Sequence, residues 1–230
     1  MTETLLLAAI LIPCLIVAIV FHEVAHGWTA LALGDPTAKE QRRLSLNPIR
    51  HVDPVGTLLV PGALALFGGP IFGWAKPVPV RGDRLRDPRF GMVAVAAAGP
   101  ATNLVLAFIG ALVFGAVSGT IIASGGTPPD WLLSAGGMFI LINVFLALFN
   151  LLPIPPFDGS HIVGGLLPPK WAANWQKLQS MGMLFFIILI AATWAFPNSG
   201  LIENTVLPPV LWLQERYFEI AEWMARGIAG

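Results

Sequence analysis

The sequence predicts an all-α membrane protein, a multi-pass helical bundle, and three observations lead to that class. Of the 230 residues, 56% are hydrophobic and only 11% are charged, whereas soluble domains are roughly 25% charged. Several apolar runs reach the roughly 18 residues that mark a membrane span. The alternating pattern of a β-barrel is not seen, so helices must satisfy the hydrogen bonds of the lipid-exposed backbone.

Three long apolar segments predict spanning helices, at residues 5–33, 90–119 and 131–152. A shorter span is expected near residues 181–196. Residues 206–213 are apolar, but the charged residues that follow them indicate that this part of the chain lies at the membrane interface.

The segment after the first predicted helix is apolar but rich in glycine and proline. So many helix breakers in residues 54–75 argue against one straight spanning helix. Broken backbone at membrane depth is tolerated where protein or water covers it. We therefore expect a re-entrant element, and a β-hairpin is one form that it could take.

The basic residues predict the orientation in the membrane. They gather in residues 39–50, 76–89 and 160–178, whereas residues 120–130 contain no Lys or Arg. The positive-inside rule places the three basic segments in the cytoplasm and the N-terminus outside, most simply in the cell membrane. The net charge of zero gives no sign of a nucleic-acid partner, and the single cysteine, Cys14, excludes an intrachain disulfide.

An H-E-x-x-H sequence, formed by His22, Glu23 and His26, lies inside the first predicted span. Positions i and i+4 of a helix share a face, so His22 and His26 can bind one zinc ion. Glu23 is placed to take a proton from a zinc-bound water, whose pKa the ion lowers to roughly 7. A helix end that reaches the headgroup region would explain this polarity, but it would not explain the spacing.

Zinc needs a third protein ligand, and Asp158 is the main candidate. It follows an uncharged apolar run at the predicted cytoplasmic end of the third helix, on the same membrane face as the two histidines. An Asp-Gly turn at a helix end is the structural alternative, and His161, one helical turn further on, is an alternative ligand. We expect His51 to be solvated and Asn143 to form a hydrogen bond between helices.

H-E-x-x-H in one span and N-x-x-P-x-x-x-x-D-G at the end of another resemble the site-2 protease family of intramembrane zinc metallopeptidases. The resemblance extends to the small-residue stretch at residues 99–103 and to the Pro-rich residues 76–80. There is no room for an inserted PDZ or CBS domain, so the chain is similar to the minimal members. We expect residues 1–165 to form the catalytic membrane core and residues 166–230 to be accessory helices of the same domain.

The resemblance implies a role for each matching residue. One zinc ion per chain would be held by His22, His26 and Asp158, and Glu23 would be the catalytic acid and base. Asn150 would position the substrate or steady the oxyanion, and Asn103 would support the site.

The leading expectation is hydrolysis of peptide bonds in transmembrane or membrane-adjacent protein substrates. A metal- or proton-coupled transporter is the alternative, but it would distribute polar residues along several spans instead of gathering them at one depth. A non-catalytic scaffold is a third reading, and Glu23 argues against it because metal binding alone does not require that carboxylate. The expected partners are a transmembrane substrate and the lipid bilayer.

The Pro-rich segment has the composition of a substrate-binding strand. Pro77 and Pro79 remove the N–H donors from one edge, whereas Lys76, Val78 and Val80 keep paired N–H and C=O groups on the other. A transmembrane substrate must be locally extended to be cleaved, and a strand edge is the usual way to hold it. A rigid linker in polyproline II conformation is the alternative.

Overall fold

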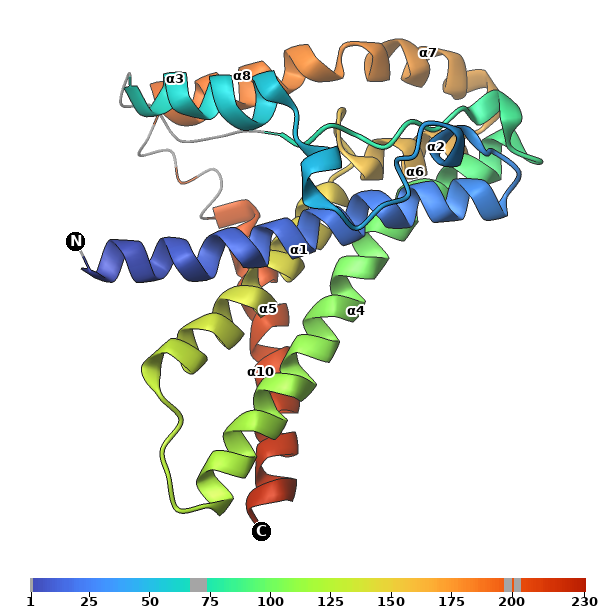
Figure 1. The fold of residues 1–230 in the computed structure, drawn as a ribbon. Coiled ribbons are helices and arrows are strands. Elements are labelled where there is room, and N and C mark those ends of the chain that lie inside the picture. Colours follow the sequence, from blue (N-terminus) through green and yellow to red (C-terminus); the bar gives the residue numbers. More distant parts are fainter. Residues whose placement is uncertain (1, 67–73, 197–199, 201–203) are drawn as a thin grey trace. The chain divides into compact units, whose positions relative to one another are not determined.

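The computed structural model of the chain describes residues 2–66, 74–196, 200 and 204–230, and every element assigned in these ranges is helical. Within these ranges, three helices are long and apolar enough to cross a membrane (Figure 1). They are α1 (Thr2–Ala32), α4 (Pro88–Ala123) and α5 (Asp130–Asn150). The helical membrane class and the three long predicted segments are therefore confirmed.

Among the described residues, the C-terminal part of the chain contains the helices α8 (Gly182–Ala195) and α10 (Leu207–Ala229). α8 has 14 residues, which is about 21 Å of helix and less than the roughly 30 Å of a hydrocarbon core. α10 is an amphipathic helix of 23 residues. The remaining helices are α2 (Thr37–Glu40), η1 (Pro48–His51), η2 (Pro54–Leu59), α3 (Val60–Leu66), η3 (Gly82–Arg84), α6 (Asp158–Leu166) and α7 (Pro169–Ser180).

The segment after α1 does not support a β-hairpin. η2 and α3 make residues 54–66 helical, and residues 74–81 belong to no helix or strand. The helical stretch begins at Asp53, whose Oδ1 accepts the backbone N–H groups of Val55 (2.9 Å) and Gly56 (2.8 Å). Proline is well suited to the first turn of a helix, which is where the chain uses Pro54. Residues 67–73 lie outside the described ranges.

The chain forms two compact units. The first contains residues 1–18, 101–149 and 202–230, and the second contains residues 19–100 and 150–201. Each unit thus combines segments from before and after residue 165. The division into a catalytic core and accessory helices at that residue remains a prediction about function.

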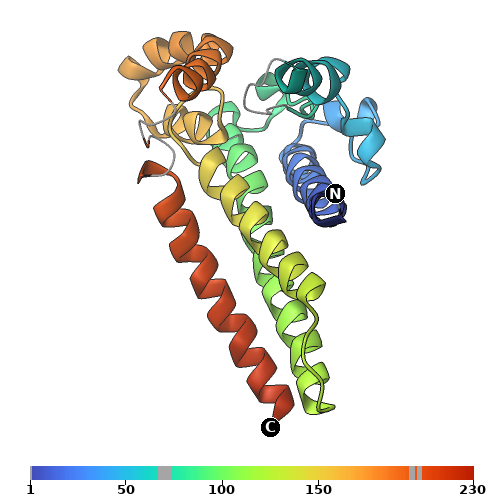
Figure 2. The same ribbon diagram turned by 90° about the vertical axis from the view of Figure 1, so that its left-hand side faces the viewer.

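The first unit is built from helices that lie side by side, α4, α5 and α10 (Figure 2). Two buried amides cross-link its elements: Asn103 Nδ2 donates to Ala18 O (3.0 Å) and to Asn143 Oδ1 (2.9 Å). This confirms the expected interhelical role of Asn143. The buried apolar core of the unit consists of Ala107, Ala111, Ile140, Val144, Val210 and Ala221.

Small residues let α10 approach α4 closely. A Cβ added at Gly115 would collide with the backbone of Ala221, and one added at Gly119 would lie 2.6 Å from the carbonyl oxygen of Ala225. Both pairs are spaced by four residues, the pattern with which membrane helices bring their backbones together. The expected interfacial segment is therefore also a packed part of this unit.

In the second unit, the end of α1 is tied to the segment that follows residue 80. The buried carboxylate of Asp35 accepts the backbone N–H groups of Thr37 (3.0 Å) and Arg81 (2.6 Å). Burial would raise the pKa of Asp35, but these hydrogen bonds outweigh burial and lower it. Arg86 N–H donates to Leu33 O (2.9 Å), so the chain runs along the last turn of the helix.

The short helix α6 is held at both ends by neighbouring helices. Arg89, in the first turn of α4, donates from Nε to Gly165 O (2.6 Å) and from Nη2 to Leu167 O (2.6 Å). These bonds satisfy carbonyls at the C-terminal end of α6, where a helix lacks internal partners. On α7, Trp175 Nε1 donates to Ser160 O (2.8 Å). Because Asp158 is the first residue of α6, these contacts also fix the position of its backbone.

Candidate metal centre

Three side chains of the second unit converge on one point. His22 and His26 lie one turn apart on α1, and Asp158 is the first residue of α6. The two Nε2 atoms are 3.0 Å apart. Asp158 Oδ2 lies 3.1 Å from Nε2 of His22 and 3.3 Å from Nε2 of His26. The geometry thus joins the H-E-x-x-H helix to the aspartate predicted as its third partner.

The spacing of these atoms fits a zinc ion. Ligand atoms at about 2.0–2.1 Å from tetrahedral zinc are about 3.3 Å from one another. Asp158 Oδ2 is buried and makes no hydrogen bond of ordinary geometry. A buried carboxylate oxygen needs a compensating partner, and two imidazoles with one carboxylate form a donor set that zinc commonly uses.

A backbone carbonyl orients one of the two imidazole rings. His26 Nδ1 lies 2.7 Å from Val95 O. Because a carbonyl oxygen only accepts, Nδ1 carries the proton, and Nε2 of the neutral ring presents its lone pair toward Asp158 and His22. Such a partner behind the ring is usual for histidines that bind metals. The sequence offered no signal for Val95, because its role depends on how α4 packs.

Two glycines permit the close packing around the histidines and the aspartate. A Cβ at Gly99 would lie 2.5 Å from His26 Nε2 and 2.6 Å from His22 Cε1. A Cβ at Gly159 would collide with the carbonyl oxygens of residues 151 and 152. Position 99 therefore brings α4 against both rings, and position 159 lets the chain turn sharply beside Asp158.

Asp158 is ionised at neutral pH. Burial alone would raise its pKa, but the close contacts with His22 and His26 outweigh burial, so that the pKa falls to about 2. A carboxylate that needs no deprotonation at neutral pH is ready to bind a cation.

Glu23 faces the Pro-rich segment. Its Oε2 accepts the backbone N–H of Val78 at 2.7 Å. The buried guanidinium of Arg43 holds the preceding backbone, because Nη2 donates to Lys76 O (2.7 Å) and also contacts Pro77 O (3.3 Å). The segment predicted as a substrate strand therefore lies against the predicted catalytic carboxylate.

The other two edge positions of that segment, Lys76 and Val80, make different contacts. Lys76 N–H donates to His51 O (2.8 Å), and Val80 packs in a cluster with Ala30 and Val95. The expectation that His51 is solvated is wrong: its side chain is buried, and Nε2 lies 2.7 Å from Ser45 O. The contact with Ser45 O and the backbone bond from Lys76 to His51 O hold this residue inside the fold.

The remaining candidates lie on defined elements. Asn150 is the last residue of α5, and Asn103 is buried in the first unit. His161 lies on α6 with its Nδ1 3.4 Å from Gln179 Nε2, and it is not part of the cluster that Asp158 forms with the two histidines. Catalytic or supporting roles for Asn150 and Asn103 remain predictions.

Known proteins resemble this chain over most of its length. A family model described as peptidase family M50 matches residues 116–191. YwhC of Bacillus subtilis is 40% identical over 199 residues, which cover 83% of this chain and 86% of YwhC. The chain belongs to peptidase family M50.

More distant relatives carry the same description as YwhC, "Putative zinc metalloprotease". Rip2 of Mycolicibacterium smegmatis is 28% identical, with 76% of this chain and 64% of Rip2 aligned. MJ0611 of Methanocaldococcus jannaschii is 31% identical, with 63% of each chain aligned. No solved structure matches the chain.

Membership of this family confirms the predicted resemblance to site-2 proteases. The chain is an intramembrane zinc metallopeptidase, and three helices in its described part are apolar enough to span a membrane. Nothing in the family or in the relatives' names supports the transporter alternative.

Proposed function

We propose that this M50 peptidase hydrolyses peptide bonds of transmembrane or membrane-adjacent proteins at one zinc ion per chain, held by His22, His26 and Asp158. The observation that carries the proposal is the triangle of two Nε2 atoms and Oδ2, with sides of 3.0, 3.1 and 3.3 Å. Zinc bound there would polarise the scissile carbonyl and lower the pKa of a bound water to roughly 7.

Glu23 acts as the general base and then as the general acid. It is next to a ligand in the chain but is not part of the ligand cluster, so its carboxylate is available for proton transfer. It takes the proton of the attacking water and then delivers it to the leaving amine. Asn150 positions the substrate carbonyl, and Asn103 supports the site by fixing the helices that carry it.

Residues 76–80 hold the substrate in an extended conformation. The Val78 N–H that Glu23 accepts is the donor nearest to the catalytic carboxylate among the contacts of this segment. A substrate carbonyl that takes over this N–H frees Glu23 for the water. Binding of an extended substrate and release of the base are thus one event in this proposal.

The active site lies near the cytoplasmic side of the cell membrane, with the N-terminus outside. Residues 39–50, 76–89 and 160–178 contain most of the basic residues, and the positive-inside rule assigns them to the cytoplasm. The segment that follows α1 re-enters the membrane from that side in this proposal. The short helices η2 and α3, over residues 54–66, suit a segment that does not cross it, and residues 67–73 of the predicted re-entrant range lie outside the described residues.

The proposal is tested by zinc content and cleavage in ligand variants. Purified His22→Ala, His26→Ala and Asp158→Ala should each lose most of the bound zinc and most of the cleavage of a generic transmembrane substrate. His161→Ala is the matched control, because His161 lies on α6 one turn from Asp158 but outside the ligand cluster. Full zinc content in Asp158→Ala together with zinc loss in His161→Ala would show that the third ligand is misassigned.

A further inference from the structure

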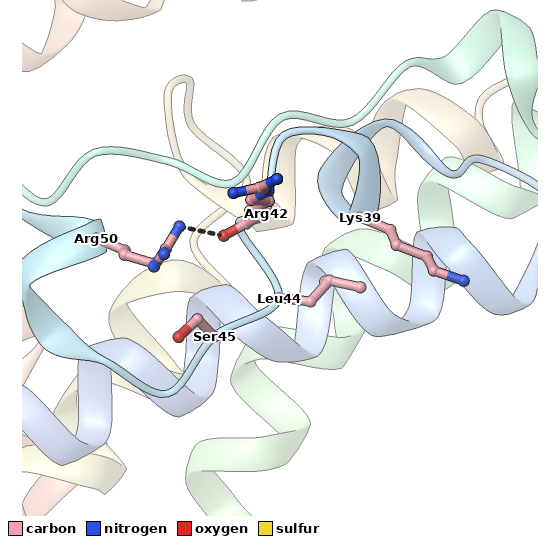
Figure 3. A pocket seen from close by; sticks show the side chains of 5 residues that line it. All are labelled: Lys39, Arg42, Leu44, Ser45 and Arg50. Carbon is pink, nitrogen blue, oxygen red and sulfur yellow. Dashed lines mark hydrogen bonds between the residues drawn. The ribbon is translucent and has the colours of Figure 1, made fainter.

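A positively charged cavity lies in the second unit, away from the metal ligands in sequence. It has a volume of about 320 Å³ and is lined by Lys39, Arg42, Leu44, Ser45 and Arg50 (Figure 3). None of these residues is acidic. Among the residues that the structure describes, no carboxylate forms an ion pair with any of the three cations. The cavity therefore concentrates positive charge that the protein does not neutralise.

The cavity wall is fixed to α1 and to the following loop. Leu44 packs on α1 at Gly27, where an added Cβ would lie 2.5 Å from the leucine Cδ2. Ser45 O is held by the imidazole of the buried His51. Arg50 Nη1 donates to Arg42 O (3.2 Å), as Figure 3 shows. These contacts fix the backbone of the cavity wall and orient the guanidinium of Arg50 before any ligand binds, which lowers the entropic cost of binding.

Arg42 occupies a backbone position at which glycine is the usual residue. Its φ angle is 54°, in the left-handed region. Arg42 N–H donates to Lys39 O (2.9 Å) and Arg43 N–H donates to Ala38 O (2.8 Å), the pair of bonds that closes a helix in a Schellman motif. Glycine would relieve the strain here, so an arginine at this position fits a requirement for its side chain.

Exposed apolar side chains adjoin the cationic residues. Ile49, next to Arg50, is 77% exposed, and Leu46, next to Ser45, is 55% exposed. Val52 and Val55 continue the exposed apolar stretch. A surface that combines cations with exposed aliphatic side chains near the end of a membrane span matches the boundary between lipid headgroups and acyl chains. α1 is such a candidate span, and it ends at Ala32.

We propose that this cavity binds the phosphate of an anionic phospholipid headgroup. The guanidinium groups of Arg42 and Arg50 bind the phosphate oxygens as planar forks. The side chain of Lys39 points away from them (Figure 3), so it adds only to the positive potential around the cavity. Ile49 and Leu46 contact the first part of the acyl chains. The proposal concerns lipid binding and goes beyond the peptidase activity.

The test measures thermal unfolding of the full chain in a neutral detergent. Dihexanoyl phosphatidylglycerol should raise the unfolding temperature by a few degrees, and dihexanoyl phosphatidylcholine should not. Arg42→Gly and Arg50→Gln should each lose most of this shift. Arg42→Gly should unfold without lipid at the wild-type temperature or above it, because glycine suits the backbone there, so that a loss of response cannot be assigned to misfolding.

A matched control separates the cavity from general surface charge. The double variant Lys170→Gln, Lys177→Gln removes two exposed cations of α7 outside the cavity and should keep the full shift. An equal loss in this control, or no shift in the wild type, would overturn the proposal. Ile49→Ser should weaken the response to the lipid. A shift produced equally by inorganic phosphate and unaffected by Ile49→Ser would identify a free-anion site and overturn the lipid assignment.

Discussion

Gly99 has no room for a side chain, because a Cβ there would lie within 2.6 Å of both histidine rings. Gly99→Ala must therefore move α4 or displace the rings from Asp158. We predict that it lowers zinc affinity about tenfold or more, the effect expected when the support of metal ligands is disturbed. Zinc titration of the apoprotein is the measurement.

Gly227→Ala is the matched control for this substitution. Gly227 is also a helical glycine, on α10, and an added Cβ would have no neighbour within 4 Å. It should bind zinc like the wild type. Equal affinity in Gly99→Ala would mean that the packing of α4 on the histidines is not needed for metal binding.

Arg43 acts on Glu23 through the backbone of residues 76–78. Its guanidinium holds the carbonyls of Lys76 and Pro77, and the next N–H, that of Val78, donates to Glu23. Arg43→Met should lower kcat about tenfold with zinc content unchanged, because the donor to Glu23 is no longer held in place. If only the positive charge of Arg43 matters, Arg43→Lys should restore kcat. If the guanidinium must contact both carbonyls, Arg43→Lys should not restore it. Steady-state kinetics with paired zinc analysis decides between them.

At the scale of residues, the sequence was informative where chemistry depends on spacing along one helix. His22, Glu23 and His26 could be predicted because helical geometry alone brings them together. Predicting Asp158 as a ligand required two separate motifs, one in each of two helices, and the inference that both lie on the same face of the membrane. Val95 and Arg43 could not be predicted, because their contacts depend on how segments far apart in sequence pack.

The Pro-rich element provides a prediction about substrate binding. In a Glu23→Gln, Cys14→Ser background, cysteines at positions 76 and 80 should cross-link to substrate residues that flank the scissile bond. Val78 is buried, so a cysteine there should react weakly until substrate displaces its neighbours. Mass spectrometry of the cross-linked peptides identifies the partners. Cross-links confined to the loop beyond Arg81 would favour the rigid-linker alternative.

At the scale of elements, long apolar helices were predictable and broken ones were not. α1, α4 and α5 follow from length and hydropathy, which dominate in lipid. Residues 54–66 form short helices because Asp53 caps the first of them and Pro54 occupies its first turn. The number of glycines and prolines in this segment did not reveal this local start of a helix. The packing of α10 was missed, although Gly115 and Gly119 were the signal for it.

At the scale of the whole molecule, the predicted orientation depends on the basic segments. Ser45→Cys in a Cys14→Ser background should react with a membrane-impermeant maleimide only after the membrane is opened, because residues 39–50 are predicted to be cytoplasmic. Gel-shift detection in intact cells measures this. Thr127→Cys, at an exposed position of the predicted outside loop, is the control and should react at once. Reaction of position 45 from outside would reverse the topology.

The central claim is that Glu23 transfers protons beside a zinc ion without binding it. The most direct measurement compares zinc content and cleavage of a transmembrane substrate in one preparation of Glu23→Gln and one of the wild type. We predict near wild-type zinc in the variant, because His22, His26 and Asp158 are intact, and cleavage reduced by at least about a hundredfold, because general acid–base catalysis is lost. Cleavage at the wild-type rate by zinc-loaded Glu23→Gln would contradict the account.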